Sequence, residues 1–308
     1  MKTDRALRAR TTKLRGKPDL LDYYDPATGF YFERGNEGIV GVGAAVRIAV
    51  PAGPDHVARA ARLAAEALSS IDGEAIVTAA IPFDGSAEFE LVVPALAIVR
   101  RGKRAWMIET GAVGTALPET MPHDPPPEPW DTLRVASEAP PSSYEEAVAE
   151  ARARISAGEL DKVVLARTVV AESDHPFDVP RLLEKLRTVE PDAYRFGVRG
   201  FVGATPELLV AREGARVIAR PLAGTIARAL DPDGSRLLAS PKDQAEHRFA
   251  AEAVRSTLSS VARLDTPEPA FALSTSKLWH LATWVGGELR APAPDALTLA
   301  SILHPTPA

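Results

Sequence analysis

A lysine lies within one of the most apolar segments of the sequence. Lys162 is followed by Val163, Val164 and Leu165, and the segment 159–167 is predicted to form a β-strand covered on both faces. An ammonium group is costly to remove from water, so such a lysine either sits at the exposed end of its strand or takes part in chemistry. From this segment alone, an exposed strand-end lysine is favoured.

Glu207 is a second ionisable residue next to an apolar run. It follows a turn at Thr205-Pro206 and precedes Leu208-Leu209-Val210. A half-buried carboxyl group has a raised pKa and can stay protonated near neutral pH, as a general acid must. A solvated glutamate on an edge strand would have the same sequence pattern, and both interpretations stay open.

Glu246 is a third candidate because it lies near the start of a predicted helix. The helix begins at Ser240-Pro241, and Glu246 shares a face with Phe249, Ala250 and Ala253. The helix dipole favours negative charge near this end. By helix geometry alone, an acid that stabilises the helix is favoured over a ligand.

A Gly-Thr turn and a histidine complete the candidates. Residues 221–225 leave a strand and enter a turn, where backbone N–H groups and the Thr225 hydroxyl can hold a carboxylate. A plain turn would have the same sequence. His280 has apolar neighbours on both sides, which is more typical of a structural histidine than of a catalyst.

Helices and strands alternate along the chain. Apolar spacing and capping signals predict helices over 55–71, 142–156 and 178–189 and from Ser240, with a capping box at Ser142-Ser143-Tyr144-Glu145. Apolar runs predict strands at 75–81, 88–93, 96–101, 105–109, 159–167 and from Tyr194, and a hairpin of 207–212 with 216–220.

Composition divides the chain into four segments. Residues 1–17 form a basic N-terminal arm, 18–116 an N-terminal α/β half, 117–141 a proline-rich connector, and 142–308 a C-terminal half. We expect the two halves to form one domain.

The overall composition limits the possible partners. The chain has 308 residues, 45% of them apolar, a formal net charge of −5 and no cysteine. It offers no positive field for nucleic acid and excludes disulfides and thiolate metal sites. No apolar run is long enough to cross a membrane, and the N-terminus lacks the apolar core of a secretory signal. We expect a cytoplasmic protein that binds neither nucleic acid nor membrane.

Six motifs follow one another in the second half of the chain. They are ELDKVVLAR (159–167), FVGATPELLV (201–210), RPLAGTIAR (220–228), SPKDQAEH (240–247), KLWHLAT (277–283) and HPTPA (304–308). Taken in this order they resemble the chorismate-utilising enzymes, and within them the isochorismate synthases. The resemblance implies an α+β fold of two stacked, largely antiparallel β-sheets surrounded by helices.

The resemblance also implies a reaction and a role for each candidate. Chorismate would become isochorismate by attack of water at C2 and loss of the C4 hydroxyl. Lys162 corresponds to the general base and Glu207 to the general acid. Glu246 corresponds to a ligand of Mg²⁺, an ion that also holds the ring carboxylate of the substrate.

Further residues correspond to positions around the substrate. Gly224 and Thr225 match the Gly-Thr segment that lines it, His280 matches a histidine near the reacting groups, and Ala308 ends the HPTPA motif on the substrate side. Chorismate is therefore the expected partner, and isochorismate would serve menaquinone or siderophore biosynthesis. We expect a monomer.

Differences from the motifs of related families narrow the choice of reaction. Anthranilate synthases have glutamine in place of Lys162 and use ammonia, so no glutamine amidotransferase subunit is expected here. Aminodeoxychorismate synthases have lysine in place of Ala223. Salicylate synthases keep the lysine base but have threonine in place of Ala308. Salicylate synthase and an inactive, truncated chorismate-binding protein remain the alternatives.

The resemblance bears on length as well. The family continues for several dozen residues past the position of Ala308, with a second glutamate for Mg²⁺ and cationic residues for the substrate carboxylates. We therefore expect the chain to be incomplete relative to the family, and inactive and poorly stable alone.

Overall fold

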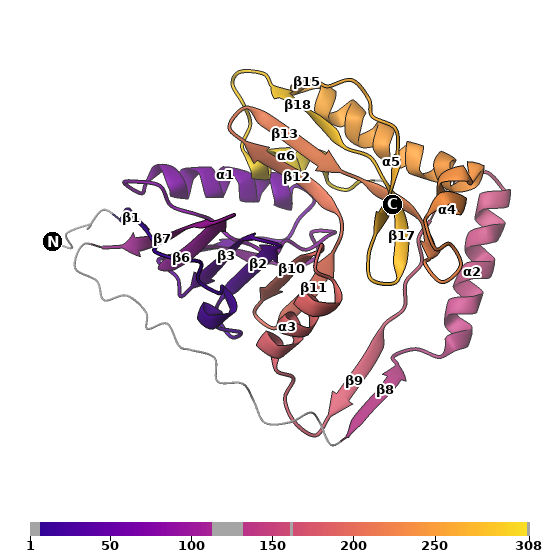
Figure 1. The fold of residues 1–308 in the computed structure, drawn as a ribbon, viewed down its shortest axis with the longest axis horizontal. Helices are drawn as coiled ribbons and strands as arrows, with labels where there is room; N and C mark the ends of the chain where they lie inside the picture. The colour runs from indigo at the N-terminus through magenta and orange to yellow at the C-terminus, as the bar shows by residue number, and fades with distance from the viewer. Residues whose placement is uncertain (1–6, 113–131, 161–162, 307–308) are drawn as a thin grey trace. The chain divides into compact units, whose positions relative to one another are not determined.

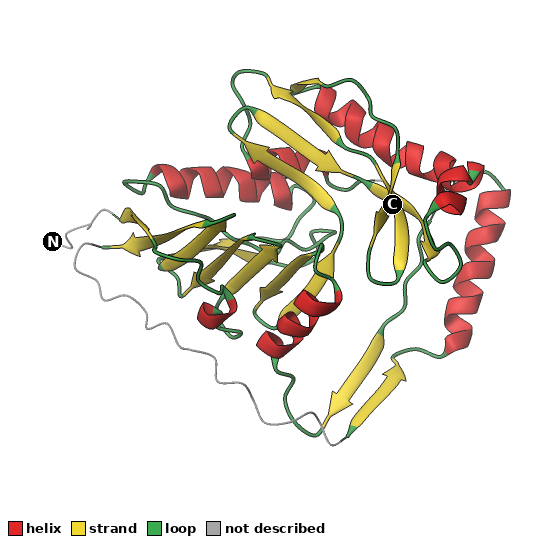
Figure 2. Cartoon of the chain, in the orientation of Figure 1, coloured by secondary structure: helices red, strands yellow, loops and turns green. Residues whose placement is uncertain are grey.

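The computed structural model describes residues 7–112, 132–160 and 163–306. The chain divides into two compact units. The first combines residues 1–124 with 179–307, and the second contains residues 125–178. Figures 1 and 2 show the helices and strands of each unit. The first unit thus draws strands from both ends of the sequence.

A seven-stranded antiparallel sheet is the largest element of the first unit. Its order is β1 (Arg8–Lys13), β7 (Arg104–Gly111), β6 (Leu96–Arg101), β3 (Glu37–Val42), β2 (Phe30–Arg34), β10 (Tyr194–Val198) and β11 (Phe201–Thr205). The pairing of β2 with β10, which sets Phe32 opposite Phe196, joins segments more than 150 residues apart. Helix α3 (Val179–Val189) and the short helix η1 (Leu21–Tyr23) bury one face, with a core of Leu20, Tyr31, Val40, Ile98 and Leu183.

A two-stranded sheet and one amphipathic helix belong to the same unit. Strands β4 (Val46–Val50) and β5 (Phe89–Val93) pair antiparallel. Helix α1 (His56–Ser69) packs Ala60 and Ala64 against Val50 and Leu91 of these strands. The apolar positions at helical spacing therefore bury the face that the sequence predicts.

The remaining strands of the first unit carry the candidate site. One sheet has the order β12 (Leu208–Glu213), β13 (Arg216–Arg220), β18 (Val285–Leu289) and β15 (Ala262–Leu264). The other has the order β14 (Leu222–Ala227), β17 (Leu278–Ala282) and β16 (Phe271–Ser274). Helices α4 (Ser235–Ala239), α5 (Pro241–Ser259) and α6 (Ala296–Leu303) pack beside them, with Val254, Leu258 and Leu299 in the core.

All pairs of named strands are antiparallel and helices pack on the sheets, which confirms the predicted α+β class. The predicted helices near residues 55–71, 178–189 and from Ser240 are confirmed, as are the strand from Tyr194 and the hairpin of β12 with β13. The predicted strand at 75–81 is wrong. Only Thr78 forms a bridge there, an isolated antiparallel one to Val92 on β5.

The second unit contains strands β8 (Leu133–Ser137) and β9 (Val169–Ser173) and helix α2 (Pro141–Ser156). The prediction of a buried strand over 159–167 is wrong for the residues described. Residues 163–167 form no strand, and Val163 and Val164 are 42% and 63% exposed. Apolar side chains form a strand only where a neighbour offers hydrogen bonds, and the β8–β9 ladder ends at Val169. Lys162 itself lies outside the described residues.

The expected capping box of α2 is also wrong. The helix begins at Pro141, and no described side chain forms a capping hydrogen bond with its first turn. Proline lacks an N–H group and has a helical φ, so it is well suited to the first helical position. Within the described parts of the chain, no helix is long and apolar enough to cross a bilayer.

A buried carboxylate ties the large sheet to α3. Glu33 on β2 is 1% exposed and accepts hydrogen bonds from the Tyr31 hydroxyl at 2.6 Å, Arg187 at 3.1 Å and Arg195 at 3.2 Å, and another from Arg100. Burial opposes its ionisation, but the Tyr31 hydroxyl and the arginines outweigh burial and hold the pKa of Glu33 below its usual range. The Glu33 carboxylate thus accepts hydrogen bonds from four side chains, one each on β2, β6, α3 and β10.

We expect Glu33→Gln to lower the free energy of unfolding by about 3 kcal/mol, because it leaves buried guanidinium groups without their counter-charge. Urea denaturation at neutral pH measures this change. Glu288→Gln, which breaks an exposed pair with Arg263, is the control and should cost less than about 1 kcal/mol. Because the pKa of Glu33 is lowered, its contribution is present at neutral pH and is lost as the pH falls through that lowered value. Equal effects of the two substitutions would contradict the prediction.

Candidate active site

Glu207 lies in the turn between β11 and β12. Its backbone N–H donates to the Thr205 hydroxyl at 3.1 Å, which fixes the turn. The residue stays accessible to solvent. Desolvation by the surrounding protein raises the pKa of the Glu207 carboxyl, while the Leu222 N–H group and the Arg220 charge oppose that rise. A reachable carboxyl with a raised pKa can act as a proton donor.

Arg220, which the sequence analysis did not single out, lies at the end of β13 and is 2% exposed. Its Nη2 donates to the carbonyl oxygen of Pro206, the residue before Glu207. Its guanidinium carbon lies 4.9 Å from the centre of the Trp284 ring. The sequence signal that could have identified Arg220 is its position directly after the apolar run Val217-Ile218-Ala219.

Gly224 and Thr225 lie on β14, at an irregularity in its pairing with β17. Gly224 has φ +76°, and a Cβ added there would lie 3.1 Å from the Cβ of Asp243 in the first turn of α5. Glycine therefore allows β14 to approach the N-terminus of α5 closely. The Gly-Thr segment and the start of α5 are held side by side.

Thr225 and His280 face each other across β14 and β17. The Thr225 hydroxyl lies 3.0 Å from Nδ1 of His280. Burial lowers the pKa of His280, with the charge of Glu190 opposing it, so the neutral imidazole is favoured at neutral pH. Two residues singled out from the sequence thus form one hydrogen-bonded pair.

Helix α5 presents Glu246 in its second turn. The Ser240 hydroxyl accepts from the Asp243 N–H at 3.3 Å, which confirms the predicted cap. Glu246 is half-buried, whereas Phe249 is 53% exposed, so the apolar face that Glu246 shares is only partly buried. A half-buried carboxylate near a helix N-terminus suits a ligand as well as a dipole partner.

A metal site would depend on few protein ligands. Among the residues that the structure describes, no group of three or more His, Asp or Glu could hold a metal ion. Mg²⁺ commonly binds through one or two carboxylates and completes its shell with water and substrate oxygens. The Glu246 carboxylate fits that donor set. Lys162 and Ala308 lie outside the described residues.

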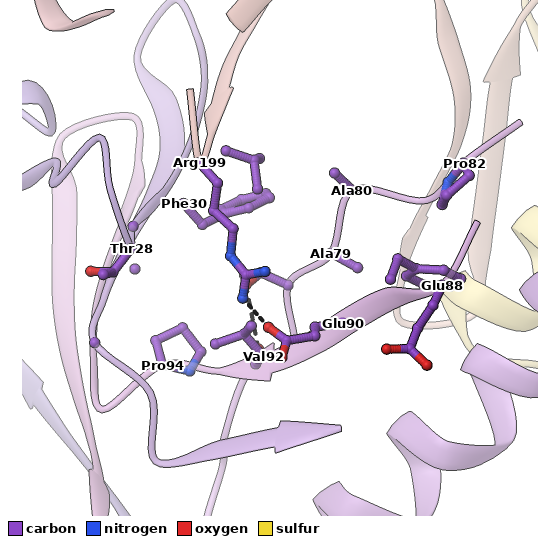
Figure 3. A pocket seen from close by; sticks show the side chains of 16 residues that line it. Thr28, Phe30, Ala79, Ala80, Pro82, Glu88, Glu90, Val92, Pro94 and Arg199 are labelled. Carbon is purple, nitrogen blue, oxygen red and sulfur yellow. Dashed lines mark hydrogen bonds and ion pairs between the residues drawn. The ribbon is translucent and has the colours of Figure 1, made fainter. Parts of the chain in front are cut away.

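A separate cavity of about 290 Å³ lies elsewhere in the first unit (Figure 3). Arg199 reaches across it from the β10–β11 turn to pair with Glu90 on β5, and Phe30 and Pro94 form part of the wall. None of the predicted site residues that the structure describes lines this cavity. The candidate active site therefore lies at β12–β14 and α5 and not in this cavity.

Comparisons with known proteins identify the family. The sequence model of the family described as "Chorismate binding enzyme" matches residues 103–308. The isochorismate synthase DhbC of Bacillus subtilis is 38% identical over 185 residues, 54% of this chain and 46% of that protein. The putative isochorismate synthase MenF of Mycobacterium tuberculosis is 34% identical over 253 residues, 76% of this chain and 63% of that protein.

A solved structure agrees with these matches. The putative 2,3-dihydroxybenzoate-specific isochorismate synthase DhbC of Bacillus anthracis superposes with a TM-score of 0.76 at 29% identity, over 94% of this chain and 75% of that chain. The chain spans between about half and two thirds of the length of the two curated relatives. From its sequence and its fold, the chain belongs to the chorismate binding enzyme family.

Proposed function

We propose that this chain carries the isochorismate synthase reaction, the conversion of chorismate to isochorismate. The observation that carries the proposal is the Glu207 carboxyl, which is reachable from solvent and has a raised pKa. Relatives named as isochorismate synthases support it.

The reaction needs an acid and a base on opposite sides of one ring. Lys162 takes a proton from water as the water oxygen bonds to C2. Glu207 gives its proton to the C4 hydroxyl, which departs as water while the ring double bonds shift. Water is a poor nucleophile and hydroxide a poor leaving group, so both proton transfers are required. No ammonia is used, and we propose that no amidotransferase subunit takes part.

The residues around Glu207 would orient the substrate. Backbone N–H groups near Gly224 and the Thr225 hydroxyl can hold a substrate carboxylate. The hydrogen bond between the Thr225 hydroxyl and Nδ1 of His280 fixes the orientation of that hydroxyl. Ala308 would border the ring.

Glu246 would hold Mg²⁺, which neutralises the ring carboxylate when bound. We expect Glu246→Gln to raise the Mg²⁺ concentration for half-maximal activity about tenfold, with partial rescue by excess Mg²⁺, because water can replace one oxygen ligand. Glu252→Gln, an exposed change on the same helix, is the control. Identical Mg²⁺ titrations of wild type and Glu246→Gln would remove Glu246 from the metal site.

Product analysis tests the function as a whole. Incubation of the full-length protein with chorismate and Mg²⁺, followed by chromatography, should yield isochorismate alone. Salicylate together with pyruvate would assign the chain to salicylate synthesis instead. Binding of chorismate without any product would identify an inactive chorismate-binding protein.

A further inference from the structure

Arg220 is a buried cation without a carboxylate at ion-pair distance among the described residues. A charge in such a position normally costs several kcal/mol unless it is paired. The other nearly buried arginines, Arg100 and Arg195, both pair with Glu33. Arg220 therefore needs a different explanation.

Neutral groups hold the Arg220 guanidinium in one orientation. Nη2 donates to the Pro206 carbonyl oxygen, and the Trp284 ring lies against the guanidinium at 4.9 Å. Its Nε has no hydrogen-bond partner within the described parts of the chain. Desolvation lowers the pKa of Arg220, helped by the like charge of Arg34 and opposed by Tyr194 and Glu207, but arginine stays protonated. The guanidinium is thus a fixed positive charge.

Two structural features connect Arg220 with Glu207. The first is the Pro206 carbonyl, which belongs to the peptide bond that enters Glu207. The second is the strand junction, where Pro221 separates Arg220 from Leu222, whose N–H group acts to lower the pKa of the Glu207 carboxyl. Proline fixes its own φ, so the backbone that joins Arg220 to Leu222 has one free torsion angle fewer.

We propose that Arg220 is a positioning residue for Glu207, fixing its turn and supplying the positive charge that faces the carboxylate left after proton donation. Its catalytic consequence rests on the proposed function. As Glu207 gives up its proton, the new carboxylate is stabilised by Arg220 and by the Leu222 N–H group. Without that charge Glu207 would be a weaker acid.

The titration of Glu207 tests this role without any enzyme assay. Carboxyl ¹³C resonances of labelled glutamate are followed against pH in the full chain, and the signal lost in Glu207→Gln is assigned to Glu207. We expect Arg220→Gln to move this titration to higher pH. Arg216→Gln, an exposed arginine on the same strand that pairs with Asp265, should leave it unchanged. Unchanged titration in Arg220→Gln would overturn the proposal.

Arg220→Lys tests whether the charge or the planar shape of the side chain matters. It also provides a second variant in case Arg220→Gln misfolds. Lysine keeps the charge but lacks the planar group that stacks on Trp284. The titration of Glu207 should then stay closer to wild type than in Arg220→Gln, although turnover falls. A shift as large as in Arg220→Gln would contradict an electrostatic role.

Steady-state kinetics measure the consequence. We expect Arg220→Gln to lower kcat about tenfold, less than complete loss of general acid catalysis, with little change in KM. A large rise in KM at constant kcat would instead mean that Arg220 binds substrate, and would overturn the proposal. If the wild type forms no isochorismate, the proposed function fails while the titration still decides the role of Arg220.

Discussion

Replacement of Glu207 by glutamine is expected to reduce kcat for isochorismate formation by about 10²–10⁴-fold, the usual value of general acid catalysis. Glutamine keeps the size and hydrogen bonding of the side chain but has no acidic proton. The hydrogen bond from the Glu207 N–H to Thr205 is a backbone contact and should persist. KM should therefore change little, as steady-state assays can check.

The pH dependence of the wild type follows from the same group. Burial raises the pKa of Glu207 above its ordinary value, so the protonated form persists to higher pH than in water. A general acid is active only while protonated. Activity that depends on Glu207 should thus be present below its pKa and be lost as the pH rises through it, and Glu207→Gln should lack this transition.

Glu213 offers a matched control for Glu207→Gln. It lies at the other end of β12 and forms an exposed 3.4 Å pair with Arg101. Glu213→Gln should retain wild-type kinetics. If Glu207→Gln loses less than about tenfold in kcat and shows a large rise in KM, Glu207 binds substrate and is not the acid.

Lys162→Ala is expected to abolish turnover, because water is then not deprotonated as it attacks C2. Lys103→Ala, in the exposed turn between β6 and β7, is the control and should be fully active. The circular dichroism of both variants should match the wild type, since a lysine contributes a base but little packing. Near-wild-type turnover of Lys162→Ala would remove the lysine from the mechanism.

Lys162→Gln is the sharper form of this test. Glutamine stands at this position in the relatives that use ammonia, so the variant should lose water-dependent turnover. We expect it to gain weak ammonia-dependent conversion of chorismate, measured by product analysis with and without an ammonium salt. Activity with water comparable to the wild type would contradict the assigned base.

The elements with local signals were predictable from the sequence. Helix α5 begins where Ser240, Pro241 and Asp243 predict it, because a cap is completed within four residues. Helix α1 and the β12–β13 hairpin follow for the same reason, since apolar spacing and a glycine turn act over a few residues. The candidate residues Glu207, Glu246, Thr225 and His280 were singled out from the sequence, largely because ordered motifs resemble a family, and their roles stay predictions.

The tertiary structure decided what depends on distant neighbours. Residues 163–167 look like a buried strand but form none, because β-structure requires a partner that no local pattern specifies. The pair of Thr225 with His280 comes from the register of β14 and β17, across 55 residues. Arg220 meets Trp284 only when β13 is paired with β18, which begins directly after Trp284. Sequence alone thus determined which groups can do chemistry, whereas burial and strand pairing determined which of them meet.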